Sequence, residues 1–275
     1  MLSIPAAGER THCANDLRRL KCIERYRYQR FLQHREGLRS RFRLTGEIKV
    51  KLYMHPMSTT SRPVRLLIAE NKLDVEEQSI DLFTGEHTQD EYAALNPNKL
   101  VPVLEDGDFR LSESSAILKY LADKFDLPSY PKDLQERARI NERMDWFNTQ
   151  FMREFAYGLT YPQLFPHQKR PSDEVQNATI AWGKARAEAW LEVLDKHLIG
   201  ANQEYLCGDT ITIADYFGAC LITLGELTRC NFSAYPNVSR WLANMKKLKS
   251  WKTVNEALDG LAEQLKDQPF EAIGA

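Results

Sequence analysis

The sequence predicts an α/β unit with the element order β-α-β-α-β-β-α, followed by an all-α helical bundle. Up to Phe125, short β-type runs alternate with segments whose apolar residues recur at helical spacing, and a turn signal separates the last two runs. After two prolines, Pro128 and Pro131, the apolar residues recur at helical spacing only. We therefore expect domains over residues 48–126 and 134–275, joined by a linker over residues 127–133.

The composition indicates the class of protein. The 275 residues are 43% hydrophobic and 27% charged, as in soluble globular proteins, and no apolar run approaches the ~20 residues of a membrane helix. Five cysteines form neither a CxxC pair nor a metal-ligand spacing, so we expect free thiols, no metal and a cytoplasmic location. The net charge of −1 gives no general nucleic-acid signature, and we expect no membrane partner.

The first half begins with a strand over Lys49 to Met54, in which polar and apolar residues alternate. A polar loop over residues 55–63 leads into a helix that has Pro63 in its first turn. A second strand is expected over Val75 to Leu82, and a short helix over Glu91 to Leu95. A helix between the first two strands predicts a parallel crossover.

A β-hairpin is expected next. Val101 to Glu105 and Asp108 to Leu111 are short β-type runs, and Asp106-Gly107 between them is typical of a type I′ turn, which needs positive φ at both central positions. Ser112-Glu113-Ser114-Ser115 then offers helix-capping side chains before a helix that closes at Phe125. The hairpin therefore predicts an antiparallel edge on the sheet.

Two features of this hairpin suit a small acidic peptide. A cis bond at Val101-Pro102 would turn the backbone groups of Val101 outward, free to pair with an extended ligand. Glu113 and Ser114 lie at the predicted helix N-terminus, whose free N–H groups favour an anion such as a carboxylate. Prolines and caps of this kind also occur with a purely structural role, so both readings stay open at this point.

Three motifs carry a resemblance to a known family. Asn96-Pro97, Val101-Pro102 and the run from Glu113 to Leu121 occur in an order and at separations that resemble the glutathione-binding half of soluble, cytosolic glutathione S-transferases. The similarity covers about residues 49–266 and is strongest up to Phe125. It implies a thioredoxin-like first domain and a helical second domain that binds the electrophile, and it is closest to theta-like, serine-type enzymes of bacteria or organelles.

The reaction that this resemblance implies is attack of the glutathione thiolate on an electrophilic carbon. A free thiol has a pKa of ~8.5, so a hydroxyl that donates to the sulfur anion favours ionisation. Ser58 aligns with the theta pattern Ser-x-x-x-Arg that ends at Arg62, and we expect it to be the catalytic residue. Thr59 and Ser61 are its rivals, whereas Tyr53 lies inside a strand and is a weaker candidate.

The resemblance also implies the residues that bind glutathione. Glu113 would pair with the γ-glutamyl ammonium, and Ser114 would hold the γ-glutamyl carboxylate through its N–H and hydroxyl. Backbone groups of Val101 would pair with the cysteinyl segment, and His87 matches a position near the glycine end. Lys99 stands where the family often has a small residue, and it either contacts a carboxylate or is a plain surface lysine.

The helical half is expected to hold the hydrophobic electrophile. Ser172 is predicted to cap a helix, and Thr212 to Asp215 resembles a capping box. The apolar face of the helix after Ser172 is expected to consist of Val175, Ala178, Trp182, Ala185 and Ala189. Candidates for the electrophile pocket, of which most are expected to be core, are Met57, Trp146, Phe147, Phe151, Phe155 and Tyr157.

Two functions follow from these observations. The first is a glutathione transferase that acts as a homodimer, as family members do, on halides, epoxides or similar electrophiles. The alternative is a non-catalytic module of the same fold that binds ligands or proteins. Such relatives usually lose the acid-handling pair, whereas Glu113-Ser114 is intact here.

A basic segment precedes the family pattern. Residues 1–46 carry eleven basic and four acidic side chains, and the pattern begins near Lys49. The extension over residues 1–47 is predicted to be disordered or to be a start-site artefact. Nucleic-acid binding or organelle targeting would rest wholly on this segment, and nucleic acid is not an expected partner.

Overall fold

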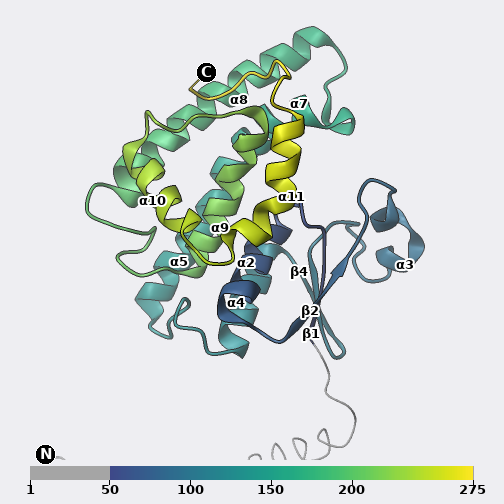
Figure 1. Ribbon diagram of the computed structural model, residues 1–275, viewed down its shortest axis with the longest axis vertical. Helices are drawn as coiled ribbons and strands as arrows, with labels where there is room; N and C mark the ends of the chain where they lie inside the picture. Colours follow the sequence, from purple (N-terminus) through teal and green to yellow (C-terminus); the bar gives the residue numbers. More distant parts are fainter. Residues whose placement is uncertain (1–49, 275) are drawn as a thin grey trace, which may run out of the picture. The chain divides into compact units, whose positions relative to one another are not determined.

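The computed structural model describes residues 50–274, and the predictions made for residues 1–47 lie outside this range. A four-stranded sheet has the order β2-β1-β3-β4 (Figure 1). Strands β1 (Val50–Met54) and β2 (Val75–Ser79) pair in parallel, while β3 (Val103–Asp106) pairs antiparallel with β1 and with β4 (Phe109–Ser112). The mixed sheet of a thioredoxin-like fold is therefore confirmed.

Helices cover both faces of this sheet because side chains alternate along each strand. Leu52 and Leu104 are fully buried on the face that packs against α2 (Ser61–Asn71) and α4 (Ser114–Lys124). On the opposite face, Tyr53 and Val103 form a smaller cluster with Tyr92 of α3 (Asp90–Ala93). Helix α2 supplies the parallel crossover between β1 and β2.

The hairpin turn lies one residue later than predicted. Asp106 pairs with Phe109, so the two central residues are Gly107 and Asp108. Gly107 has φ of 63° and Asp108 does not have a positive φ, which rules out the type I′ turn predicted at Asp106-Gly107. Glycine takes the first central position because it alone reaches positive φ without steric cost.

The predicted capping of α4 by serine side chains is wrong. The residue that precedes the helix is Glu113, with φ of 67° and ψ of 110° and no side-chain hydrogen bond to the first turn. Ser114 and Ser115 already belong to the helix. The left-handed backbone at Glu113 makes the turn from β4 into α4, so no serine stands in the N-cap position.

The second half is helical throughout. Two longer helical stretches run from α5 (Leu134–Trp146) through α6 (Met152–Glu154) to α7 (Tyr161–Leu164), and from α8 (Asp173–Val193) to Ile199. Helices α9 (Ile213–Ile222), α10 (Pro236–Lys246) and α11 (Trp251–Gln264) follow. Among residues 50–274, no helix combines the length and apolar character that a membrane-spanning segment requires.

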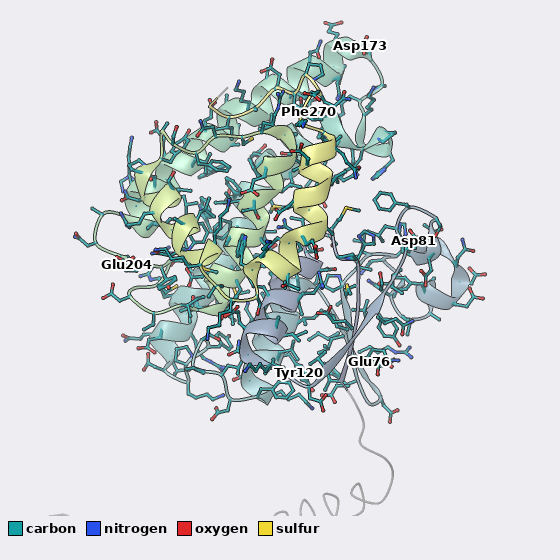
Figure 2. The ribbon with its side chains drawn as sticks, viewed as in Figure 1. Glu76, Asp81, Tyr120, Asp173, Glu204 and Phe270 are labelled. Atoms are coloured by element: carbon teal, nitrogen blue, oxygen red, sulfur yellow. The ribbon has the colours of Figure 1, made fainter. Side chains whose placement is uncertain are left out.

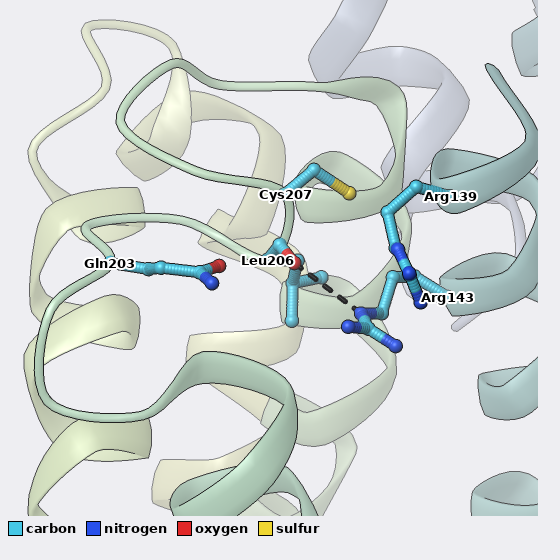
Figure 3. Close-up of a pocket in the computed structure, with 5 residues that line it drawn as sticks. All are labelled: Arg139, Arg143, Gln203, Leu206 and Cys207. Atoms are coloured by element: carbon cyan, nitrogen blue, oxygen red, sulfur yellow. Dashed lines mark hydrogen bonds between the residues drawn. The ribbon is translucent and has the colours of Figure 1, made fainter. Parts of the chain in front are cut away.

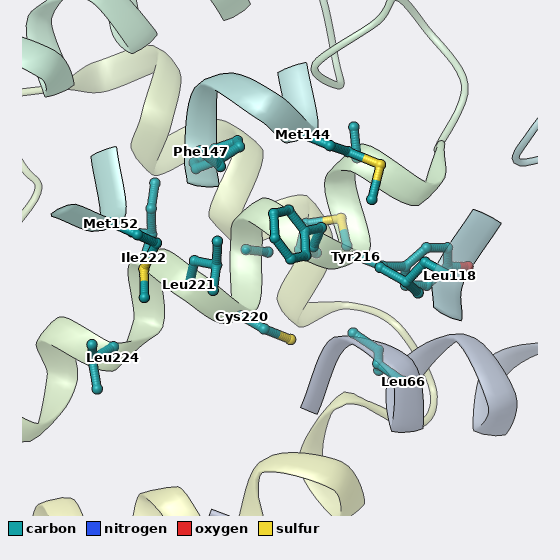
Figure 4. Packing of buried hydrophobic residues seen from close by; sticks show 14 of the residues in the cluster. Leu66, Leu118, Met144, Phe147, Met152, Tyr216, Cys220, Leu221, Ile222 and Leu224 are labelled. Atoms are coloured by element: carbon teal, nitrogen blue, oxygen red, sulfur yellow. The ribbon is translucent and has the colours of Figure 1, made fainter. Parts of the chain in front are cut away.

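Helix α9 is the centre of this half, since all ten of its residues are buried. Figure 4 shows Tyr216 and Leu221 of α9 among side chains from other helices, including Leu66 of α2 and Met144 of α5. The predicted capping box is confirmed: the side chains of Thr212 and Asp215 each bond to the other residue's backbone.

The apolar face predicted for α8 is the wrong one. Ser172 caps the helix as predicted, but Val175 and Trp182 are 45% and 56% exposed, and the three predicted alanines are exposed as well. The buried face carries Gly183 instead, packed so closely on Gly158 that a Cβ would lie 2.4 Å from its backbone carbon. The other buried residues of α8 are Ile180, Ala187 and Leu191, so the buried face has an apolar pattern of its own, offset from the predicted one.

Candidate functional site

The loop between β1 and α2 is held by hydrogen bonds within itself. The N–H of Ser58 donates to the carbonyl of His55 (3.0 Å), and the N–H of His55 donates to Oγ of Ser61 (3.4 Å). The N–H of Met57 donates to Nδ1 of His55 at 3.3 Å. Burial lowers the pKa of His55, which keeps its imidazole neutral and able to accept that bond. The loop backbone is therefore fixed before any ligand arrives.

This geometry distinguishes the three candidate hydroxyls. Ser61 is fully buried, and its Oγ is already bonded to His55. Thr59 is 7% exposed, and its Oγ1 lies 3.3 Å from the hydroxyl of Tyr161, which comes from α7. Ser58 is only half-buried, and its Oγ accepts the N–H of Ser61 at 3.2 Å. Among these three residues, Ser58 is the least buried.

Thr60 links Ser58 to Val101, which lies two residues before β3. Oγ of Ser58 lies 3.2 Å from Oγ1 of Thr60, which in turn donates to the carbonyl of Val101 at 3.0 Å. Since Thr60 gives its hydrogen to Val101, the hydrogen between the two hydroxyls comes from Ser58. The hydroxyl of Ser58 is thus oriented as a donor, with Thr60 as its acceptor.

The Val101-Pro102 bond is cis. Leu100, the residue before Val101, is anchored by two donors. Its carbonyl accepts from the hydroxyl of Tyr92 and from Nδ2 of Asn96, both at 2.8 Å. Asn96, of the Asn-Pro motif, is itself buried. The motif therefore fixes the chain just before Val101, while the Leu100 side chain is 61% exposed.

Glu113 and Ser114 lie close to the start of β3 through strand pairing. Ser112 pairs with Val103, so the N-terminus of α4 follows directly beside the start of β3. Ser114 is buried at the first position of α4, whereas Glu113 is exposed. Asn148, from the helical half, donates to Oγ of Ser115 at 3.4 Å. A buried hydroxyl and a helix N-terminus are thus available to an anion, with a carboxylate beside them.

His87 and Lys99 lie on the segments around α3. His87 lies in a 3₁₀ turn at Glu86–Thr88. Its Nδ1 is buried without a hydrogen-bond partner among the described residues. Nζ of Lys99 donates to the carbonyl of Thr88 at 2.8 Å. No hydrogen bond recorded for residues 50–274 joins His87 to the loop of Ser58.

Phe83 connects the loop that follows β2 to the Ser58 loop. Figure 2 shows Asp81 at the start of this loop, where hydrogen bonds from the N–H groups of Thr84 and Phe83 lower the pKa of its carboxyl. The ring of Phe83 is 74% exposed and meets the ring of His55 edge-on, with centroids 5.5 Å apart. An exposed aromatic ring therefore stands beside the candidate site.

Most of the predicted aromatic candidates belong to the core. Phe147, Phe151 and Phe155 are fully buried, and Trp146 stacks on Phe151 with centroids 5.9 Å apart. Tyr157 is half-exposed and meets Tyr161 edge-on. The expectation that most of these side chains are core is confirmed.

Tyr161 is the residue that sequence reasoning missed. Its hydroxyl reaches Thr59, and its ring packs against Phe165, which stacks on His167. Burial raises the pKa of Tyr161 to about 12, so it is a neutral donor near pH 7. Its position four residues after Tyr157, on the same helical face, was the available signal.

The comparisons with known proteins agree with this architecture. The chain matches the family descriptions "Glutathione S-transferase, N-terminal domain" over residues 48–123 and "Glutathione S-transferase, C-terminal domain" over residues 162–249. Human glutathione S-transferase theta-1 is 34% identical over 200 residues, which are 70% of this chain and 80% of that protein. The bovine theta-1 enzyme is 29% identical over 81% of this chain and 92% of its own length.

Solved structures of glutathione transferases are also similar to this chain. The apo form of human glutathione S-transferase T1-1 superimposes with a TM-score of 0.68 at 28% identity, covering 81% of this chain and 93% of that one. Human glutathione transferase theta-2, solved in complex with glutathione and an unknown ligand, gives a TM-score of 0.70 at 25% identity, covering 82% and 94%. The chain belongs to the glutathione S-transferase family and is theta-like.

Proposed function

We propose that this protein is a glutathione transferase in which Ser58 activates the thiol of glutathione for attack on small hydrophobic electrophiles. The observation that carries the proposal is the orientation of the Ser58 hydroxyl. It accepts the N–H of Ser61, belongs to the least buried of the three candidate residues, and points its hydrogen at a replaceable acceptor, Thr60. Theta-class relatives with about 30% identity support the reaction class.

The chemical step needs the thiol as an anion. With a pKa of ~8.5 in water, only a few per cent of the thiol is ionised near neutrality. A thiolate that replaces Thr60 as the acceptor of the Ser58 hydroxyl gains a hydrogen bond that the thiol cannot match, so the pKa of the thiol falls. The proton goes to solvent, the new bond forms between sulfur and carbon, and the halide leaves or the epoxide ring opens.

Glutathione would lie along the edge formed by Val101 and the N-terminus of α4. Ser114, with its buried hydroxyl and the free N–H groups of the first turn, would hold the γ-glutamyl carboxylate. Glu113 would pair with the γ-glutamyl ammonium, and the backbone of Val101 with the cysteinyl segment. His87, whose Nδ1 lacks a partner among the described residues, would contact the glycine end.

The electrophile would enter between the Ser58 loop and α7. Tyr161 contacts Thr59, the neighbour of Ser58, and the exposed Phe83 ring and the half-buried Met57 lie on the loop side. Aromatic and thioether groups favour a small hydrophobic molecule. Aryl or alkyl halides and epoxides fit both this lining and the displacement chemistry.

We propose in addition a homodimer, a cytoplasmic location and a division into a glutathione-binding domain over residues 48–126 and an electrophile-binding domain over residues 134–275. Exposed apolar side chains on α8, Val175 and Trp182 among them, are consistent with a subunit contact. The described cysteines, Cys207, Cys220 and Cys230, are free, as expected in a reducing compartment.

The test is conjugation of glutathione to an aryl halide, an alkyl halide and an epoxide by the wild type, Ser58→Ala and Thr59→Val. We expect Ser58→Ala to lose ~10²-fold or more in kcat while calorimetry still detects glutathione binding. Thr59→Val should retain most of the activity. A wild type that binds no glutathione would instead favour the non-catalytic binding module, and equal losses in both variants would remove the special role of Ser58.

A further inference from the structure

A pocket of about 320 Å³ lies between α5 and the loop that precedes α9, outside the proposed glutathione site (Figure 3). Two arginines of α5 form one wall, and the loop supplies the other three lining residues. The lining consists of Arg139, Arg143, Gln203, Leu206 and Cys207. This volume lies at the lower end of small-molecule sites, so it suits a ligand larger than a single ion.

The two guanidinium groups share one carboxylate. Arg139 and Arg143 are four residues apart and therefore lie on the same face of α5. Glu142 pairs with both, with 3.1 Å between its Oε2 and Nη1 of Arg143. The Glu142 side chain is 53% exposed, whereas that of Arg143 is only 11% exposed. The pocket thus has an excess of positive charge and a carboxylate that can swing into solvent.

The opposite wall is rigid. The N–H of Leu206 donates to Oδ1 of the buried Asp215 at 2.8 Å, and its carbonyl accepts from Nε of Arg143 at 3.4 Å. Nη2 of Arg240 donates to the carbonyl of Gln203 at 2.9 Å. Asp215 is committed to donors from Leu206, Thr212 and Trp241, so its charge is not free to compete for the arginines. A site built on such walls loses little entropy when it binds a ligand.

The loop offers one polar group that the protein leaves unused. Oε1 of Gln203 is buried without a hydrogen-bond partner among the described residues, and Figure 3 shows this amide directed toward Leu206 and Arg143. An amide that turns over presents its NH₂ group at the same place. Burial raises the pKa of Cys207 to about 11, so the thiol on this wall is uncharged near pH 7 and does not repel an anion.

We propose that this pocket binds a small organic anion through a carboxylate or phosphate group, which displaces Glu142 and takes up the guanidinium groups of Arg139 and Arg143, with the amide of Gln203 as a third donor. Planar guanidinium groups bind both oxyanions in bidentate fashion, so the two chemistries share one site. The site is independent of Ser58 and does not rest on the transferase reaction.

Cys207 provides a reporter at the site. Alkylation of this thiol by iodoacetamide at about pH 9, followed by mass spectrometry of its peptide, measures access to the pocket. Phosphate and succinate serve as the probes, each compared with chloride at equal ionic strength. We expect one or both to slow alkylation of Cys207 while alkylation of Cys230 is unchanged. Protection by phosphate alone assigns a phosphate ligand, and protection by succinate alone assigns a carboxylate.

Variants separate the site from general surface charge. Arg139→Gln should lower the affinity for the protecting anion by about tenfold, which corresponds to ~1.4 kcal/mol. Glu142→Gln should raise this affinity several-fold, because the carboxylate that competes for the two arginines is gone. Glu136→Gln removes the same charge from an exposed position of the same helix, and it should change nothing.

Two results would overturn the proposal. One is alkylation of Cys207 that neither probe slows at concentrations up to tens of millimolar. The other is an equal gain in affinity for Glu142→Gln and Glu136→Gln, which would indicate a nonspecific field effect. Glutathione conjugation, measured in parallel, should be the same in all three variants, since none of these residues lies in the proposed active site.

Discussion

Nη1 of Arg62 lies 2.7 Å from Oδ1 of Asn255, a residue 193 positions further along the chain. Arg62 is fully buried in the first turn of α2, and its guanidinium also donates to Oγ1 of Thr223 and to the carbonyl of Cys220. All three acceptors are uncharged and belong to the helical half. Arg62 therefore joins the helix that begins beside Ser58 to the helical half, together with Arg65, which donates to the carbonyl of Val254, and Glu70, which accepts the N–H of Ser250.

Arg62→Met should destabilise the protein by about 2–4 kcal/mol, because charge-assisted hydrogen bonds are lost and the buried Oδ1 of Asn255 is left without a donor. Arg62→Lys should recover only part of this loss, since one ammonium cannot reach three acceptors in the geometry of a guanidinium. Urea unfolding measures both effects. In the double variant Arg62→Met/Asn255→Leu we expect less destabilisation than the sum of the single changes; strict additivity would mean that the two residues are not coupled.

His55 makes the Ser58 loop sensitive to acid. Burial lowers the pKa of His55 in the folded protein below its unfolded value of ~6.5, so the unfolded state binds more protons in the window between the two values. The stability contributed by neutral His55 is therefore present above that window and is lost as the pH falls through ~6.5 toward the folded pKa. Protonation also removes the acceptor of the Met57 N–H.

His55→Asn tests this prediction, because an asparagine oxygen can accept an N–H two residues later but does not titrate. We expect a flatter dependence of unfolding free energy on pH between 5 and 7 in this variant than in the wild type, measured by urea unfolding across that range. His55→Ala should lose about 1 kcal/mol at pH 7 through the missing acceptor. Parallel pH profiles for the wild type and His55→Asn would contradict the role assigned to His55.

Tyr161→Phe removes the hydroxyl that crosses from α7 to Thr59. We expect a stability loss of about 1 kcal/mol and a higher KM for the electrophile, with little change in glutathione affinity. Since the pKa of Tyr161 is raised to about 12, its state does not change below pH 10, and the pH profile of the variant should match that of the wild type. Tyr157→Phe, at a half-exposed ring on the same helix, is the control. An unchanged KM in both would place the electrophile elsewhere.

Gly183→Ala should destabilise the protein by about 1–3 kcal/mol, because its Cβ would meet the backbone of Gly158 where neither helix can yield. Gly260→Ala in α11 is the matched control. A Cβ there meets nothing within 4 Å, so the same change should stabilise the helix by roughly 0.5–1 kcal/mol. Chemical unfolding compares the two variants directly, and a tolerated alanine at position 183 would mean that α8 can shift away from Gly158.

The contrast between Gly183 and Trp182 explains where sequence reasoning succeeds. Periodicity locates α2 and α4 because large apolar side chains lie on one face of each helix. The α9 capping box is found from the spacing of Thr212 and Asp215 instead. On α8 the buried residues are Ile180, Gly183, Ala187 and Leu191, which also recur at helical spacing. Trp182 stays exposed, so the residues chosen from the sequence lie on the wrong side of the helix. The close contact of Gly183 with Gly158 decides which of the two patterns faces the core, and that contact joins two different helical segments.

The candidate site divides in the same way. Ser58 and Val101 are named through the resemblance, and their roles stay predictions; the structure brings them together through Thr60. Tyr161 could not be placed, since its contact with Thr59 spans 102 residues and depends on how the helical half packs on α2. The arginine pocket likewise forms between α5 and a loop more than 60 residues later.

The most direct test of the account is the pKa of the glutathione thiol bound to the wild type and to Ser58→Ala, followed by thiolate absorbance against pH. If Ser58 stabilises the thiolate, the bound thiol ionises well below its solution pKa of ~8.5 in the wild type and returns toward that value in the variant. A bound thiol with the same depressed pKa in both proteins would contradict the account and assign the activation to another group.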